Sequence, residues 1–205
     1  PDNKEAIVTI AKDKEQTNTI IYLWHKHDIV PNEAKKNMDY LVMNYMKSMI
    51  NNMLNARLNE LKETPQPPFI YAVTEDGNFF LSKTGIAVSK EDGIDTALSA
   101  LTREIERVRQ FGFTASEYAR AKADYLRQLE SAYNERDKVK NNAYVNEYVR
   151  HFIDNEPIPG IDAEYAIMNQ IAPNIPVEAI NSFIPSLVND SNIVVNIFCP
   201  EKEGM

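Results

Sequence analysis

The sequence predicts an α+β domain in which helices pack on one face of an antiparallel or mixed β-sheet, in two layers. Two observations support this class. Runs of β-branched and aromatic residues alternate along the chain with segments whose apolar residues recur at three- and four-residue steps. The apolar stripes of those segments are one-sided, so each helix has one face to bury and one face for water. We expect residues 1–205 to form a single domain.

Five strands are expected, four of them paired as two hairpins. The first hairpin is predicted to turn at the polar segment Lys12–Asn18. The second is predicted to turn at Glu75-Asp76-Gly77, because Asp-Gly is a strong turn signal. The expected strands are Ala6–Ala11, Thr19–Trp24, Phe69–Thr74, Asn78–Ala87 and Ile193–Phe198.

A long helix is predicted from Pro31 to Thr64. Its apolar residues form one continuous stripe, and Lys, Asn and Glu fill the rest of its surface. Five of the seven methionines lie between Met38 and Met53, and we interpret this methionine-rich stripe as facing the core rather than as an adaptable binding surface. The helix must end by Thr64, since proline cannot continue it. The prolines that follow are Pro65, Pro67 and Pro68.

Two later helices have starts marked by capping-box spacing, in which a hydroxyl residue precedes an acidic residue by three positions. These pairs are Ser89 with Asp92 and Thr114 with Glu117. The second pair opens a long segment that runs toward Phe152, and the polar stretch 134–142 is expected to break or bend it. Two shorter helices, 163–171 and 177–187, precede the last strand.

The composition limits the classes of function. A hydrophobic content of 43% is enough for a packed core, whereas a net charge of −8 leaves no basic stripe for a phosphate backbone. We therefore expect no nucleic-acid partner. The apolar runs are shorter than the roughly 20 residues of a membrane span, so no span is expected. Cys199, the single cysteine, lies in an apolar run and is predicted to be buried and unreactive.

The residue types of common catalytic sites are present, but not in the required order. His25 and His27 lie on the same side of a predicted strand, a spacing compatible with a metal ion. No carboxylate completes an HExxH or HxxEH pattern, and a solvent-facing pair at a strand end is the preferred interpretation. His151 is interpreted as a surface or helix-end residue. The GxSxG, GxGxxG and P-loop patterns are absent, so the chemistry alone does not describe an enzyme.

Three phrases occur in the order and spacing typical of one peptidase family. The phrase 112–122, GFTASEYARAK, resembles a "G-hydrophobic-T-x-x-E-hydrophobic-x-x-A-K" entry into a long helix. The phrase 55–61 is similar to a helix end of the form "s-R-L-x-x-x-L-R-E", and 69–73 resembles the "a-Y-s-v" strand that follows it. The chain thus resembles, over essentially its whole length, the insulinase (pitrilysin) family of zinc peptidases, in particular its non-catalytic, C-terminal-type domain.

The resemblance implies a non-catalytic domain from a longer zinc metalloendopeptidase, in which it helps to build the chamber that encloses a peptide. It implies no catalytic, cofactor-binding or metal residue in this chain. Zinc and the general base are expected in the parent's catalytic domain, since HxxEH is absent here. The expected partners are other domains of the same parent chain and a peptide substrate. The chain alone is predicted to be inactive, and a periplasmic or secreted parent is compatible with the resemblance.

An alternative remains open, namely a structural or peptide-binding subunit of the same fold that has no catalytic role. A third hypothesis is an unrelated metal-binding protein that uses His25 and His27.

The resemblance also implies candidate substrate contacts. In the family, an arginine at the end of a helix and a tyrosine on the next strand help to hold the substrate, and these positions fall on Lys62 and Tyr71. Phe69 is a third candidate contact. Lysine lacks the planar guanidinium of arginine, and the proline-rich insertion Thr64–Pro68 lengthens the gap to Tyr71. The strand Phe69–Val73 is a candidate edge strand for pairing with a substrate.

Overall fold

The computed structural model describes residues 2–77, 82–90 and 92–201 of the chain. The chain forms two compact units, each described in turn. The first unit comprises Pro1–Asp28, Ile50–Phe113 and Asn181–Met205, and the second comprises Ile29–Met49 and Thr114–Ile180. The predicted α+β class is confirmed, because a mixed sheet combines with helices. None of the helices in the described ranges is long and apolar enough to cross a membrane.

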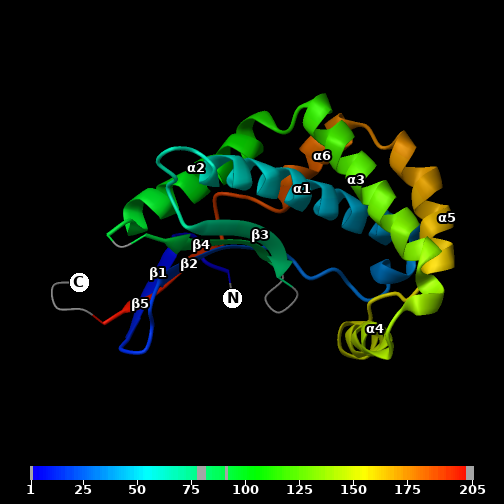
Figure 1. Ribbon diagram of the computed structural model, residues 1–205, viewed down its shortest axis with the longest axis horizontal. Coiled ribbons are helices and arrows are strands. Elements are labelled where there is room, and N and C mark those ends of the chain that lie inside the picture. Colours follow the sequence, from blue (N-terminus) through cyan, green and yellow to red (C-terminus); the bar gives the residue numbers. More distant parts are fainter. Residues whose placement is uncertain (1, 78–81, 91, 202–205) are drawn as a thin grey trace. The chain divides into compact units, whose positions relative to one another are not determined.

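The first unit is built on a five-stranded sheet with the strand order β1-β5-β2-β4-β3 (Figure 1). β1 runs parallel to β5, and the other neighbouring strands are antiparallel. The strands are β1 (Ile7–Asp13), β2 (Thr19–Lys26), β3 (Tyr71–Gly77), β4 (Ser82–Ser89) and β5 (Ile193–Pro200).

The predicted first hairpin is wrong, because β5 lies between β1 and β2. Ile197 of β5 stands opposite Ile10 of β1 on one side and Ile21 of β2 on the other. β5 is largely apolar and takes an interior position in the sheet, whereas every residue of β1 is exposed, as suits an edge strand.

The second hairpin pairs β3 with β4 as predicted, but its turn is not at Asp-Gly. Asp76 and Gly77 belong to β3, where they stand opposite Lys83 and Ser82. The predicted start of the second strand, 78–81, lies outside the described residues.

Helix α2 (Ile94–Phe111) packs against β2 and β4 and covers one face of the sheet (Figure 1). Its buried stripe includes Leu101 and Ile105, which are 0% and 2% exposed. The close approach requires a glycine on β4, because a Cβ at Gly85 would lie 3.1 Å from Leu101 Cδ2.

The predicted cap of α2 at Ser89 is wrong. The helix begins after Gly93, and no side chain caps it. Ser89 is the last residue of β4 and is buried, because the register places it opposite Thr19 on the covered face of the sheet.

Helix α1 (Met38–Lys62) contributes residues 38–49 to the second unit and 50–62 to the first. Its predicted start at Pro31 is wrong, because a short 3-10 turn (Ala34–Lys36) precedes it and Asn37 has extended backbone angles. Its predicted end before Thr64 is confirmed. The core-facing interpretation of the methionines is confirmed for Met49 and Met53, which are 0% and 2% exposed, and it is wrong for Met38, which begins the helix and is 50% exposed.

The end of α2 shows why the phrase that begins at Gly112 is suited to this fold. Gly112 has φ +67°, a value that favours glycine, and ends the helix. The Asn181 side chain accepts from Phe113 N (2.8 Å) and donates to Phe113 O (3.0 Å). The Arg57 guanidinium donates to Gly112 O (3.2 Å) and lies 4.8 Å from the Phe113 ring centre.

The second unit is helical. The predicted capping box is confirmed: Thr114 Oγ1 accepts from Glu117 N, and Glu117 Oε2 accepts from Thr114 N. The predicted break at 134–142 is also confirmed, because α3 ends there and α4 begins after a 3-10 turn. The helices are α3 (Ala115–Asn134), α4 (Asn141–Asp154), α5 (Ile161–Ile171) and the first part of α6 (Val177–Phe183).

A tyrosine pair holds part of this unit together. Tyr45 OH lies 3.0 Å from Tyr118 OH, which donates to the carbonyl of Ile175 at 2.8 Å. The Tyr45 ring also packs edge-on against Tyr125. Since both hydroxyl groups are buried, these bonds satisfy polar atoms that would otherwise destabilise the core.

Candidate functional site

The three predicted contact residues lie in different environments of the first unit. Lys62 ends α1, where its ammonium group lies 3.6 Å from Glu63, and its side chain is 39% exposed. Phe69 is 0% exposed and packs in the core, whereas Tyr71 begins β3 and is 47% exposed. The structure therefore presents Lys62 and Tyr71 to solvent, and Phe69 anchors the segment that precedes β3.

β3 lies at the edge of the sheet, as pairing with a substrate strand requires. Part of this edge is already occupied by α1. Asn55 accepts from Thr74 N (2.6 Å) and donates to Thr74 O (3.0 Å), and Asn51 donates to Asp76 (2.7 Å). An added strand would therefore have to pair before Thr74, next to Tyr71.

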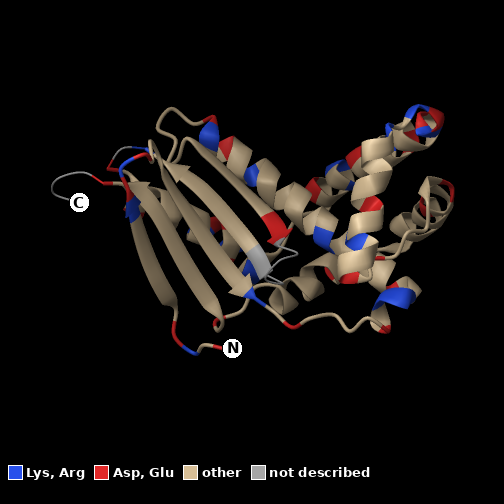
Figure 2. Ribbon diagram, turned by 90° about the horizontal axis from the view of Figure 1, so that it is seen from below, with Lys and Arg blue, Asp and Glu red and all other residues tan. Residues whose placement is uncertain are grey.

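The face of the sheet opposite α2 is rich in aromatic and apolar side chains. Along β2 every second residue is buried under α2, and the residues between them, such as Tyr22 and Trp24, point to this second face. Tyr22 stacks on Trp24 and meets Phe198 of β5 edge-on, both with ring centres 5.8 Å apart. Figure 2 shows this face with no helix in front of it and with charged residues confined to the strand ends. We call it the open face.

The open face has a shallow hollow of about 230 Å³. Trp24 and Lys26 of β2 and Val194 and Asn196 of β5 line it. A hollow between an indole ring and aliphatic stems is suited to an apolar side chain of a bound segment.

The histidines do not form the predicted solvent-facing pair. His25 is 6% exposed on the covered face of β2, so that part of the prediction is wrong. His27 lies beyond the strand, and its ring is 3.1 Å from the carbonyl of Asp28. His151 is exposed near the end of α4, in agreement with the prediction, and its ring lies 2.6 Å from the carbonyl of Glu156.

The residues that the structure describes contain no group of three or more His, Cys, Asp or Glu side chains that could hold a metal ion. Cys199 is buried in β5, as predicted.

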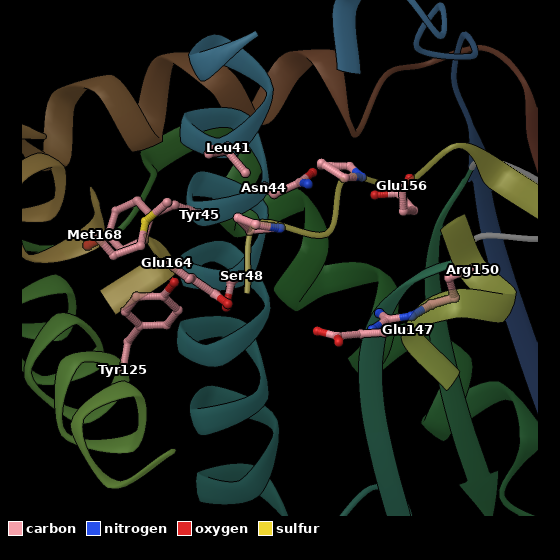
Figure 3. Close-up of a pocket in the computed structure, with 12 residues that line it drawn as sticks. Leu41, Asn44, Tyr45, Ser48, Tyr125, Glu147, Arg150, Glu156, Glu164 and Met168 are labelled. Carbon is pink, nitrogen blue, oxygen red and sulfur yellow. The ribbon is translucent and has the colours of Figure 1, made fainter. Parts of the chain in front are cut away.

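The second unit contains a pocket of about 320 Å³, lined by residues of α1, α3, α4, α5 and the α4–α5 loop (Figure 3). Figure 3 shows Glu147 and Arg150 on one side and Tyr125 and Glu164 on the other. Apolar surface comes from residues that include Leu41 and Met168. The pocket thus combines apolar walls with charged groups.

One of the acidic residues at this pocket already has partners. Tyr40 OH donates to the Glu156 carboxylate and lies 2.6 and 2.7 Å from its two oxygens, and Glu156 also pairs with Lys35 at 3.1 Å. Burial and the bond to Glu156 raise the pKa of Tyr40, which keeps this hydroxyl protonated as a donor. These bonds fix the α4–α5 loop, and with it one wall of the pocket.

The other charged groups of the pocket are available to a ligand. Within the described ranges, no hydrogen bond or ion pair reaches the side chains of Glu147, Arg150 or Glu164. Burial, and then the nearby Glu147, raises the pKa of Glu164. Burial and the Glu164 carboxylate raise the pKa of Tyr125 to about 12. Negative charge is therefore poorly compensated on the Glu164 side.

Sequence reasoning missed this pocket. Its charged residues come from separate helices, and no local pattern connects Tyr125 with Glu147 or Glu164. In a chain with 30 acidic residues, a single glutamate on a helix carries no distinguishing signal.

The fold described above is an α+β domain with a mixed five-stranded sheet, and comparisons with known proteins match it to the fold of peptidase domains. No family model matches the sequence. The chain is 24% identical over 202 residues to a protein described as "Zinc protease PQQL-like" from Arabidopsis thaliana, covering 98% of this chain and 18% of that protein.

Three solved structures share the fold. The periplasmic protease PqqL from Escherichia coli matches 97% of this chain with a TM-score of 0.79 at 16% identity, over 22% of its own length. A predicted insulinase family protease from Yersinia pestis matches 98% (TM-score 0.75, 10% identity, 43% of that chain). The peptidase M16 inactive domain from Pseudomonas fluorescens also matches 98% (TM-score 0.67, 14% identity, 45% of that chain).

The predicted resemblance to an insulinase-family inactive domain is therefore confirmed. The chain has the fold of these peptidase domains, and the Arabidopsis relative is described as a zinc protease. It spans about a fifth of the length of the Arabidopsis protein and of PqqL.

Proposed function

We propose that this chain is a non-catalytic domain of a zinc metalloendopeptidase and that it helps to build the chamber enclosing the peptide. Zinc and the general base reside in another domain of the parent protein. The partners of this chain are those other domains and the peptide substrate.

The observation that carries the proposal is the open face of the sheet. A sheet whose two faces are both buried needs a packed layer on each side. Within the described part of the first unit, α2 covers one face, and Figure 2 shows no helix over the other. Aromatic side chains such as Tyr22 and Phe198 give the other face a rigid apolar surface with polar edges, which suits transient contact with an unfolded peptide.

Lys62 and Tyr71 would extend this contact. Tyr71 belongs to the same edge strand, whose backbone is occupied at Thr74 by Asn55, so a substrate strand would pair beside Tyr71. Lys62 would contribute a single flexible positive charge where the family has an arginine.

A spin-labelled unstructured peptide tests the proposal. We expect it to broaden the NMR signals of the Tyr22, Trp24 and Tyr71 side chains more than those of Leu101 and Ile105 on the covered side. Equal broadening on both faces, or none, would contradict a peptide-facing role. The same peptide should remain intact when incubated with the chain and zinc, and its cleavage would contradict the assignment of zinc and base to another domain.

The alternative is a structural or peptide-binding subunit of the same fold in an assembly without catalysis. The sequence of the parent upstream of Pro1 separates the two. An HxxEH pattern followed by a glutamate some tens of residues later favours the peptidase, and its absence favours the subunit.

A further inference from the structure

The pocket of the second unit has a chemistry that the proposed function does not use. Its volume of about 320 Å³ is at the lower end of the range for ligand pockets, which begins near 300 Å³, and is adequate for one long side chain. Leu41, Tyr125 and Met168 supply apolar walls, and Glu147, Arg150 and Glu164 supply charge. A ligand that fits must therefore combine an apolar stem with a polar head.

The charges select the sign of that head. Glu156 is already neutralised by Lys35, so its carboxylate does not seek a further cation. The Glu164 carboxylate has no ion-pair or hydrogen-bond partner among the described residues, and Glu147 adds a second negative charge within electrostatic range. Arg150 is exposed and lies on the Glu147 side (Figure 3). The Glu164 side of the pocket is therefore the negative end.

We propose that this pocket binds the side chain of a lysine or arginine carried by a peptide. The ammonium or guanidinium group would lie against Glu164, with Glu147 strengthening the negative potential. The aliphatic stem would lie along Leu41 and Met168, in the way that long basic side chains cover apolar surface elsewhere. The Tyr125 ring lines the same pocket and would offer the cation an aromatic contact. The net charge of −8 would add a general attraction for basic peptides.

The preference for a cation stands on the pocket alone, whereas the choice of a peptide as its carrier rests on the proposed function. The two can fail separately. Binding of the basic peptide at Met168 without contact to the open face would contradict the chamber role and leave this site standing. Contact at the open face without any effect at Met168 would contradict the pocket site and leave the chamber role standing.

The test uses two five-residue peptides with blocked ends, one with a central lysine among alanines and one with norleucine in place of the lysine. Titration of the full chain is followed by the NMR signal of the Met168 methyl group and by calorimetry. The proposal requires the lysine peptide to shift the Met168 signal and to bind at least about tenfold more tightly, the loss expected for one charge-assisted hydrogen bond. Equal affinities, or an unshifted Met168 signal, would overturn it.

Charge variants separate electrostatic recognition from structural damage. Glu164→Gln should weaken binding of the lysine peptide about tenfold and Glu147→Gln about threefold, since the second carboxylate acts at longer range. Arg150→Gln should strengthen binding, because it removes a like charge. Glu130→Gln on the exposed surface of α3 removes the same charge away from the pocket and should have no effect. Weakening in all of the pocket variants, Arg150→Gln included, would overturn the proposal.

Discussion

One face of the five-stranded sheet is packed under α2, and the opposite face, in the same strands, carries an aromatic cluster instead. The two faces share β2, in which buried and half-buried residues alternate, so neighbouring residues of one strand serve different purposes. Leu23 and His25 are in the core, whereas Tyr22 and Trp24 form the open face. The contacts that stabilise the fold are therefore concentrated on the face covered by α2, and the open face is free to make other contacts.

The largest effect is expected at the centre of the covered face. Leu101→Ala should lower the free energy of unfolding by about 2–5 kcal/mol, because Leu101 is 0% exposed and the cavity left behind cannot fill with water. Urea denaturation followed by circular dichroism measures this. A loss below about 1 kcal/mol would mean that α2 does not hold the sheet as described.

The close approach of α2 to β4 gives a second, smaller effect. Gly85→Ala adds a methyl group 3.1 Å from Leu101 Cδ2 and 3.2 Å from Ile105 Cδ1, so we expect a loss of about 1–3 kcal/mol from overpacking. In the double variant Gly85→Ala with Leu101→Val, the loss of unfolding free energy should be smaller than the sum of the two single losses, because the shorter side chain makes room for the added methyl group. If the loss in the double variant equalled the sum of the single losses, residues 85 and 101 would not be in direct contact.

The two capping-box patterns give a matched pair of variants. Thr114→Ala should cost about 1 kcal/mol, since it removes the oxygen that accepts from Glu117 N. Ser89→Ala should be neutral or slightly stabilising, because the Ser89 hydroxyl is buried under the covered face without a hydrogen-bond partner in the described residues. Thermal unfolding of both variants tests the difference, and equal losses would contradict it.

On the open face, Tyr22→Ser should change stability by about 1 kcal/mol or less, since it removes aromatic contacts at a half-buried position. The same variant should reduce the paramagnetic broadening of the open face by the labelled peptide. A loss as large as that of Leu101→Ala would show that the open face is a second core.

The smallest effect at neutral pH is expected at His25, which titrates on the covered face. Burial lowers the pKa of His25, against opposing contributions from the backbone of Asn189 and the Glu106 carboxylate. The unfolded chain therefore takes up this proton first, near pH 6.5, and stability should fall as the pH drops below that value.

His25→Gln should remove this part of the pH dependence of the unfolding free energy. His27→Gln changes a residue beyond the strand and should leave the pH dependence unchanged. Unfolding free energies measured between pH 5 and 8 give the comparison. An unchanged slope in His25→Gln would show that the imidazole has the same pKa in the folded and the unfolded chain.

Local patterns in the sequence predicted much of the fold. The Thr114–Glu117 capping box, the end of α1 before its prolines and the break between α3 and α4 depend on neighbours within a few residues, so they can be read from the chain. The resemblance to the insulinase family likewise depends on ordered phrases. The candidate contacts Lys62, Phe69 and Tyr71 came from that resemblance, and their role stays a prediction.

The sequence by itself determined the α+β class, the helix ends and the apolar periods, because these follow from backbone stereochemistry and nearby side chains. Only the tertiary structure decided that β5 separates β1 from β2, that Ser89 is buried in a strand rather than capping a helix, and that Tyr125, Glu147 and Glu164 share one pocket. Each of these depends on contacts between segments far apart in the chain, and the free energy of such contacts has no local signature in the sequence.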